Sequence, residues 1–353
     1  MAGVLDGITV VELAGIGPAP FCGMMLADHG ARVIRVVRPG GIGRFTEFDG
    51  KDVLNRNREN LTLDLKQPGS VDKVLKLVRT ADALIEGNRP GVIERLGLGP
   101  DVLLAENPKL VIGRMTGWGQ TGPKAQLAGH DINYIALTGA LHTYGRKGEK
   151  PSFPVNAIGD YAGGGMMLAF GVLAAILSAR STGKGQVIDC AMMEGAAMIS
   201  AQTYALYSAG MWVDERGVNV LDGAAPYYDT YETKDGKYVA IGSIEPQFHA
   251  LLLGVLGLTG DPDFADQSDR DLWPSAKAKI EAAFKTKTRD EWCAIMEDTD
   301  ICFAPVLSLA EAPHHPHNVA RGTFVEVNGV VQPAPTPRFS ATPAPPVRMT
   351  STR

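Results

Sequence analysis

Strand-like and helix-like segments alternate along the first 120 residues, and this alternation constrains the fold more than any other feature. GITVVEL (7–13) and ARVIRVVRP (31–39) are apolar, β-branched runs typical of buried parallel strands, and the helix-like PFCGMMLADHG (20–30) separates them. A short strand is expected at 61–66, followed by two helix–strand pairs between 71 and 117. The pattern predicts an α/β fold, with a Rossmann-like, mostly parallel sheet covered by helices.

The pattern changes in the second half of the chain. Residues 1–210 are expected to form the large domain, and the polar, Gly-containing segment 211–225 is the expected linker. PYYDTYETKDGKYVAIGSIEP (226–246) predicts a hairpin around a Lys-Asp-Gly-Lys turn. Amphipathic helices should complete a smaller α+β domain, 226–320. The segment 313–353 is Pro-rich and should run extended along the surface.

The glycine turn after the first strand, AGIGPAP (14–20), invites comparison with a dinucleotide-binding fingerprint. The third glycine of that fingerprint is replaced by Pro20. A helix without this glycine cannot pack closely on the strand, so an NAD site is rejected.

Composition excludes several other classes of function. Hydrophobic residues make up 45% of the chain and the net charge is −5, which gives no reason to expect nucleic-acid binding. The four cysteines lack C-x-x-C spacing, which indicates reduced thiols in the cytoplasm without a disulfide frame. The HHPHN loop (314–318) lacks a nearby acidic ligand, so no metal site is expected. The uncharged run 161–179 is long enough to span a membrane, but its Gly and Ala content favours a buried core helix.

Two candidate acid/base residues lie between Arg114 and Asp160. WGQTGP (118–123) follows an apolar run and should form a loop at a strand's C-terminal end, the edge where open α/β sheets bind ligands. His130 follows this loop and carries the side chain that titrates near neutral pH. The alternative is a loop histidine that is hydrogen-bonded to Asp131.

Asp160 directly precedes the uncharged run. It is expected just before a helix N-terminus, where free backbone N–H groups and the helix dipole favour negative charge. It could be only a helix N-cap, although a cap that faces the ligand edge could also act as a base. The amides around Ala162–Gly165 are candidate donors to an anionic intermediate.

Glu245 follows the strand-like YVAIGSI and precedes Pro246, which suits the first turn of a helix. One interpretation is a carboxylate that offsets the helix dipole. The basic residues Arg38, Lys66, Arg89 and Arg95 follow successive expected strands. Each alone could be a solvated surface charge, but together they could surround a phosphorylated nucleotide.

Several motifs in a fixed order resemble one known family. WGQTGP, GHDINY (129–134) and the Gly-Asp before a Gly-rich helix are similar to the class III CoA-transferase family. GHDINY, together with DGAAPYYDTYE (222–232) and IEPQF (244–248), resembles its α-methylacyl-CoA racemase branch. The resemblance extends from VVELAGIGP (10–18) to about residue 340.

The resemblance implies roles for specific residues. His130 and Asp160 would be the two proton-transfer groups, and Glu245 would orient His130 and favour its charged form. It also implies an intertwined homodimer, with the tail 321–353 returning to the large domain and each site built from two subunits. The implied contacts to CoA are Arg38, Leu63, Asp64, Leu65, Lys66, Gly87, Asn88, Arg89, Arg95, Gly129, Asp131, Ile132, Asn133 and Tyr134.

The implied reaction is epimerisation at C2 of a 2-methyl-branched acyl-CoA in fatty-acid metabolism. A thioester acidifies its α-proton, and two groups on opposite faces of C2 exchange that proton through an enolate. No cofactor is needed, because CoA is part of the substrate. Two alternatives stay open: a CoA-transferase in which Asp160 is the nucleophile, and a non-catalytic acyl-CoA-binding subunit.

Overall fold

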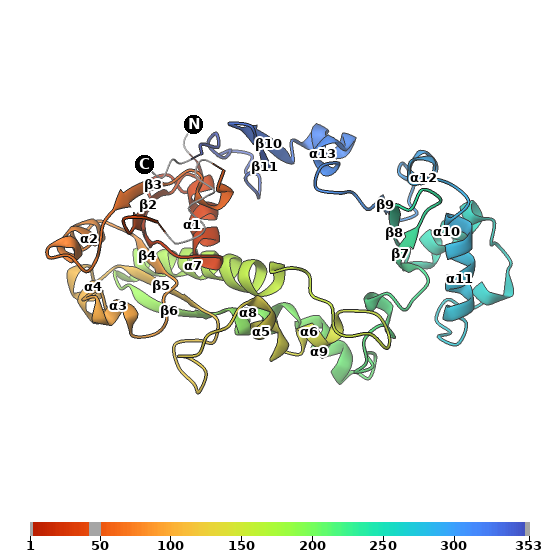
Figure 1. Ribbon diagram of the computed structural model, residues 1–353, viewed down its shortest axis with the longest axis horizontal. Coiled ribbons are helices and arrows are strands. Elements are labelled where there is room, and N and C mark those ends of the chain that lie inside the picture. Colours follow the sequence, from red (N-terminus) through yellow and green to blue (C-terminus); the bar gives the residue numbers. More distant parts are fainter. Residues whose placement is uncertain (1–2, 42–50, 350–353) are drawn as a thin grey trace. The chain divides into compact units, whose positions relative to one another are not determined.

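The computed structural model describes residues 3–41 and 51–349, and the chain divides into two units (Figure 1). The large unit comprises Met1–Ala140, Pro154–Ala201 and Pro316–Arg353, and the second unit comprises Leu141–Phe153 and Gln202–His315. The predicted division put 141–153 and 202–210 with the large domain, whereas these residues group with the second unit.

A six-stranded sheet of parallel strands forms the centre of the large unit. Its order is β3-β2-β1-β4-β5-β6. The order reverses between β1 and β4, which is the switch point where Rossmann-type sheets bind ligands. The strands are β1 (Thr9–Leu13), β2 (Arg32–Val37), β3 (Glu59–Thr62), β4 (Ala83–Glu86), β5 (Val111–Thr116) and β6 (Gln186–Ala191).

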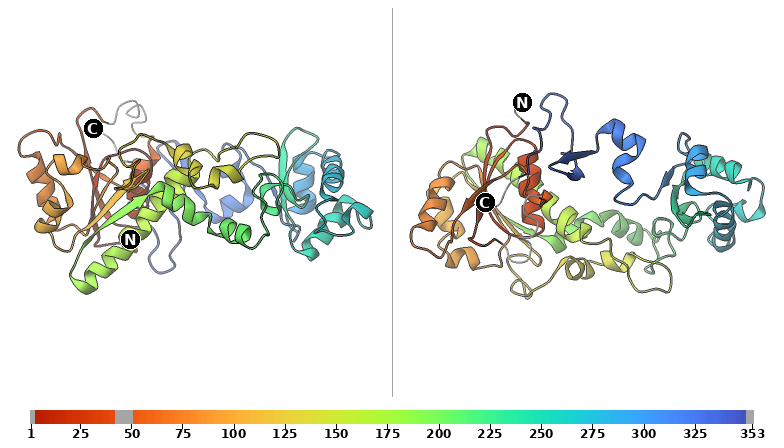
Figure 2. Two further views of the ribbon diagram at one scale, coloured as in Figure 1. Left: turned by 90° about the horizontal axis from the view of Figure 1, so that it is seen from below. Right: turned by 45° about the horizontal axis from the view of Figure 1, so that its top comes forward.

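Helices cover both faces of this sheet, because successive strand residues point to opposite sides. Val10 contributes to a core with α1 (Pro18–Asp28) and α7 (Met167–Thr182). Its neighbour Val11 contributes to a second core with the helices on the other face. These helices are α2 (Ser70–Val78), α3 (Val92–Arg95) and α4 (Pro100–Glu106) (Figure 2). The predicted α/β architecture with a parallel sheet is confirmed.

The uncharged run forms a helix that begins earlier than predicted. A π-helix, Ala157–Met166, continues directly into α7. Within the described residues this is the one helix long and apolar enough to cross a membrane by length and composition. Its inner residues Leu168, Val172 and Ile176 are buried against the sheet, whereas its other side is exposed.

The C-terminal segment belongs to the large unit. It was expected to be extended, but it contains α13 (Pro316–Arg321) and an antiparallel hairpin of β10 (Phe324–Val327) and β11 (Val330–Pro333). Buried Arg56 donates from Nη1 to Gln332 Oε1 (2.9 Å) and to the Pro333 carbonyl (2.7 Å). Gln332 is itself buried. The prediction failed because proline content is a local signal, whereas this hairpin depends on a distant arginine.

The second unit packs helices on one face of a three-stranded antiparallel sheet. The predicted hairpin is confirmed as β7 (Tyr228–Glu232) and β8 (Tyr238–Gly242), and β9 (Phe303–Pro305) pairs with β8. Tyr231, Val239 and Ile241 lie in a core with α10 (Pro246–Leu256), α11 (Trp273–Phe284) and α12 (Arg289–Met296). The remaining elements of the chain, which are divided between the two units, are η2 (Val53–Asn55), α5 (Asp131–Ala136), α6 (Ala140–Thr143), α8 (Met192–Ile199), α9 (Ala201–Ser208), η4 (Val220–Asp222), η5 (Pro262–Phe264) and η6 (Ala312–His314).

Candidate active site

The predicted CoA contacts follow the carboxyl ends of neighbouring parallel strands. Arg38 comes directly after β2, and Gly87, Asn88 and Arg89 come directly after β4. Leu63–Lys66 was predicted to complete a strand that ends at Lys66, but β3 ends at Thr62. This segment therefore follows the strand rather than forming part of it. All these residues lie at the edge of the sheet that contains the switch point.

The arginines at this edge are exposed. Arg38 donates from Nε to the carbonyl of Gly41 (2.5 Å) and is largely solvent-accessible. Arg89 and Arg95 are also exposed, the latter on α3. Lys66 is exposed as well, and its backbone N–H donates to Asp64 Oδ1 (3.0 Å). The cationic groups are therefore accessible to an anionic ligand.

A buried ion network holds the loop after β4. Glu86 is fully buried, and its Oε2 accepts from the backbone N–H of Asn88 (2.6 Å). Arg114 donates from Nε to Glu86 Oε1 (3.0 Å) and from Nη1 to Glu94 Oε1 (2.8 Å) on α3. Burial raises the pKa of Glu86, while the bonds from Asn88 and Arg114 oppose the shift. The network fixes the path of residues 86–94.

Asp160 does not precede the helix, because the helix begins at Ala157 and places it in the first turn. The N-cap is Asn156, whose Nδ2 donates to Asp160 Oδ2 (2.9 Å). The expected donors at Ala162–Gly165 consequently lie inside the helix, and that prediction was wrong.

The glycines that suggested a helix start serve close packing instead. A Cβ on Gly163 would lie 2.6 Å from the Ala196 backbone nitrogen, and one on Gly165 would lie 2.7 Å from the Pro18 carbonyl oxygen. Real Cβ atoms do not approach backbone atoms so closely, so glycine is required for contact with α8 and α1. The three glycines therefore mark an interhelical contact in mid-helix, not an N-terminus.

The Asp160 carboxylate is half-buried and faces the glycine turn after β1. A Cβ on Gly17, which has a φ of 71°, would lie 3.4 Å from Asp160 Oδ2. Burial raises the pKa of Asp160, and the charge of Asp131 raises it further. The Asn156 hydrogen bond and the charge of His130 act in the opposite direction. Asp160 therefore lies at the ligand edge with its ionisation shifted toward the range useful for proton transfer.

His130 occupies the N-cap position of α5 and is exposed. Its backbone N–H donates to Asn133 Oδ1 (3.0 Å). The alternative of a histidine bonded to Asp131 is not what the structure shows, because Asp131 is buried and its Oδ2 accepts from the N–H groups of Gly159 (2.5 Å) and Asp160 (2.8 Å). His130 thus presents its ring to solvent near Asp160, whose pKa it lowers.

Tyr134 connects the two predicted parts of the site. Burial raises its pKa, the charge of Asp160 raises it further, and the charge of Arg89 lowers it. Its hydroxyl donates to the Gly129 carbonyl, and a Cβ on Gly129 would collide with its ring (2.7 Å). Ile132 and Asn133 are exposed on the same short helix. The candidate base Asp160 and the predicted CoA contact Arg89 therefore both lie near Tyr134.

Glu245 lies in the second unit. It is the exposed N-cap of α10 with Pro246 as the first helical residue, and its carbonyl accepts from the backbone N–H of His249 (3.0 Å). Burial raises the pKa of Cys302, and the charge of Glu245 raises it further. The predicted partnership of Glu245 with His130 stays a prediction.

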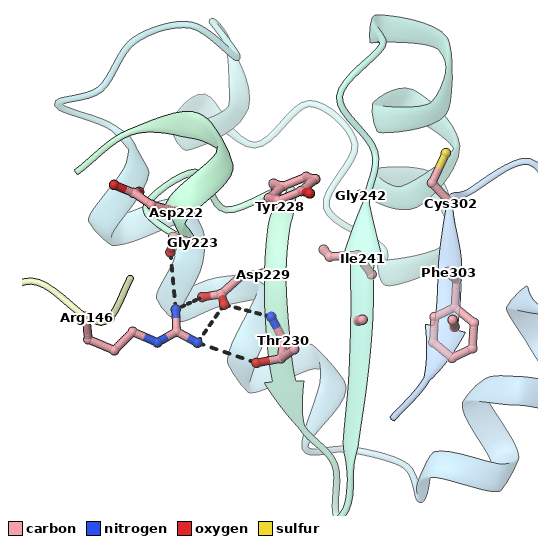
Figure 3. A pocket seen from close by; sticks show the side chains of 13 residues that line it. Arg146, Asp222, Gly223, Tyr228, Asp229, Thr230, Ile241, Gly242, Cys302 and Phe303 are labelled. Atoms are coloured by element: carbon pink, nitrogen blue, oxygen red, sulfur yellow. Dashed lines mark hydrogen bonds and ion pairs between the residues drawn. The ribbon is translucent and has the colours of Figure 1, made fainter. Parts of the chain in front are cut away.

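The sequence did not indicate Asn156, Gly17 or the pocket of about 670 Å³ on the outer face of the second unit's sheet (Figure 3). Asn156 could have been found from its spacing, because residues four apart on a helix meet. In the pocket, Arg146 pairs with Asp229 (2.7 Å), and Lys277 pairs with the same carboxylate. Small residues such as Ala240 and Ala304 leave the space above the strands open.

The histidine-rich loop makes a hydrogen bond to an acidic residue that is distant in the sequence. His315 Nε2 lies 2.5 Å from Glu297 Oε1. Among the residues that the structure describes, no three His, Cys, Asp or Glu side chains are grouped so as to hold a metal ion.

Comparison with known proteins identifies the family. The model of CoA-transferase family III matches residues 5–352. The chain belongs to CoA-transferase family III. Within this family it is 47% identical to human alpha-methylacyl-CoA racemase over 96% of this chain and 87% of that protein. It is 31% identical to the acetyl-CoA:oxalate CoA-transferase of Acetobacter aceti, over 94% and 88% of the two chains. The family fold is also seen in a CAIB/BAIF family protein from Brucella suis, with a TM-score of 0.85 and 28% identity over 99% and 96% of the chains.

Arg38→Ala is expected to weaken CoA binding by about 1–3 kcal/mol, because a charge-assisted hydrogen bond to phosphate is lost. Calorimetric titration with CoA measures the change. Arg32→Ala is the matched control, since Arg32 is the first residue of β2 and therefore lies at the opposite end of the strand from Arg38. Equal dissociation constants for the two variants would remove Arg38 from the site.

Asn156→Ala is expected to shift the acidic limb of the rate profile to higher pH. The Asn156 hydrogen bond lowers the pKa of Asp160, so its loss raises that pKa and leaves less carboxylate at a given acidic pH. The shift should appear in kcat/KM for the substrate enantiomer from which Asp160 removes the proton. If the acidic limb of the pH–rate profile stays unchanged with both enantiomers, Asn156 does not lower the pKa of Asp160.

Proposed function

We propose that this protein epimerises C2 of 2-methyl-branched acyl-CoA thioesters. One observation carries the proposal: His130 and Asp160 belong to one unit and interact electrostatically at the ligand edge of the sheet, beside exposed arginines. The similarity to alpha-methylacyl-CoA racemases over nearly the whole chain supports the same reaction.

The reaction needs two groups with opposite protonation states. The deprotonated group removes the C2 proton, the electron pair moves into the thioester carbonyl to form an enolate, and the protonated group returns a proton to the other face. His130 and Asp160 would exchange roles between the two enantiomers, so that one proton is shared between the two groups. CoA enters and leaves as part of the substrate.

A single experiment tests this function. The protein is incubated with one enantiomer of a 2-methylacyl-CoA in deuterated water without any free acid. A racemase should produce the other enantiomer and incorporate deuterium at C2. Retention of configuration without deuterium would reject the proposal.

CoA transfer is the second candidate, because transferases such as that of Acetobacter aceti are members of the same family. The half-buried Asp160 would attack the thioester carbonyl, expel CoA as a thiolate and form an acyl-aspartate. A carboxylic acid would then be required as acceptor. The exchange experiment separates the two, since a transferase without acceptor leaves C2 protonated.

We further propose that the protein acts as an intertwined homodimer. The outer face of the long helix supports association, because Met166, Phe170 and Leu177 are 49, 73 and 69% exposed and recur on one side. Assembly across subunits would let Glu245, from the second unit, complete a site that contains His130.

Complementation tests the shared site. His130→Ala chains and Glu245→Ala chains are each expected to be inactive, and heterodimers reassembled from both should recover part of the activity because one site is then intact. Separately tagged chains allow heterodimers to be isolated before assay. Isolated heterodimers without activity would show that each site is completed within one chain.

A further inference from the structure

Asp131 joins the elements that carry the two candidate bases. It is adjacent to His130 and is only 4% exposed. Its Oδ2 accepts from the backbone N–H of Gly159 (2.5 Å) and from that of Asp160 itself (2.8 Å). One carboxylate oxygen of Asp131 therefore binds the backbone at Asp160, and Asp131 is itself the residue after His130 in the chain.

These two N–H groups lie in the first turn of the Ala157–Met166 helix, where backbone donors have no partner within the helix. The usual partner would be the N-cap side chain, but Asn156 donates to Asp160 Oδ2 instead. Asp131 supplies the missing acceptor from 28 residues away in the sequence. A carboxylate suits this place, because helix N-termini favour negative charge.

Gly159 makes the approach possible. A Cβ at this position would lie 2.7 Å from Asp131 Oδ2, so no other residue fits without displacing the carboxylate. The glycine before Asp160 is therefore required by a contact with the residue after His130.

We propose that Asp131 is a positioning residue that fixes Asp160 relative to His130, and that inversion at C2 depends on it. The proposal rests on the proposed racemase function. Two bases that act on opposite faces of one carbon must keep a set separation, whereas a single base can exchange a proton from its own face without the other. The side chain of Asp131 is buried, and the predicted contact of this residue with CoA stays a prediction.

The test uses full-length Asp131→Ala and Asp131→Asn, with Asp82→Asn as the matched control. Asp82 Oδ2 also accepts from a backbone N–H, that of Thr9 (2.9 Å), but it lies before β4 at the opposite edge of the sheet. Deuterium incorporation at C2 and formation of the opposite enantiomer are measured separately from each starting enantiomer. CoA affinity is measured by calorimetry, and thermal unfolding reports the fold.

Inversion is expected to fall on the order of 10- to 100-fold in Asp131→Ala, since a displacement near 1 Å can cost this much. Exchange from the face served by His130 should fall much less, so one enantiomer should exchange without inverting. Asp131→Asn keeps an acceptor oxygen and should recover part of the loss. Asp82→Asn should match the unaltered protein in both rates.

Two results would overturn the proposal. One is inversion in Asp131→Ala at the rate of Asp82→Asn. The other is an equal fall of inversion and exchange from both enantiomers, which a general loss of structure would produce. If the unaltered protein neither exchanges nor inverts its substrate while binding CoA, the racemase function itself fails instead.

Discussion

Asp160→Asn should abolish inversion at C2, with a loss of about 10²–10⁴-fold, the usual contribution of a general acid or base. The amide keeps the shape of the side chain but cannot accept or return a proton. His130→Ala should also stop inversion, yet should leave exchange from the face that Asp160 serves. The two variants should therefore retain exchange with opposite enantiomers.

Deuterium incorporation followed by chiral analysis of the acyl group measures this pair of effects. Asp82→Asn, at the far edge of the sheet, again provides the control. The transferase alternative makes a different prediction, because its intermediate is an acyl-aspartate. A hydroxylamine-sensitive adduct at Asp160, with C2 still protonated, would replace the racemase mechanism by group transfer.

Arg56→Ala is expected to destabilise the large unit by about 3–5 kcal/mol, the effect of leaving a buried ion without its partner. Arg56 is 2% exposed and forms an ion pair with Asp28 (2.5 Å). It also donates to Gln332 and Pro333 of the C-terminal hairpin. Truncation removes the ion pair and the hairpin's main polar anchor together.

Urea denaturation and limited proteolysis of the C-terminal hairpin measure the two consequences. Arg32→Ala is the control, because Arg32 pairs with Glu59 (2.8 Å) on the surface, where both side chains are more than half exposed. Exposed pairs contribute about 0–1 kcal/mol. Similar urea midpoints and similar proteolysis rates for the two variants would show that Arg56 does not stabilise the C-terminal hairpin.

The sheet could be predicted because its signal is local. Apolar, β-branched runs at 7–13 and 31–39 are separated by a helix-like segment, and this local pattern predicted β1 and β2. Once the ends of these strands were predicted, Arg38 and Gly87–Arg89 could be placed at the carboxyl edge of the sheet, because they directly follow β2 and β4. The family resemblance supplied the roles of His130 and Asp160.

The start of the helix that carries Asp160 and the fold of the C-terminal segment could not be predicted in the same way. Gly163–Gly165 resemble a helix terminus in sequence, and only contacts with Pro18 and Ala196 show why glycine is needed there. The bonds of Asp131 to Asp160 and of Arg56 to Gln332 join residues 29 and 276 positions apart. Periodicity cannot identify such partners, since they depend on how finished elements pack.

The bond between Arg56 and Gln332 can form only late in synthesis, because the two residues are far apart in the chain. Their separation of 276 residues corresponds to roughly 14–55 s at a translation rate of about 5–20 residues per second. Throughout this interval the guanidinium lacks its hairpin acceptors, while residues 202–315 of the second unit emerge completely. The polar environment of Arg56 is therefore completed only after the C-terminal hairpin has been synthesised.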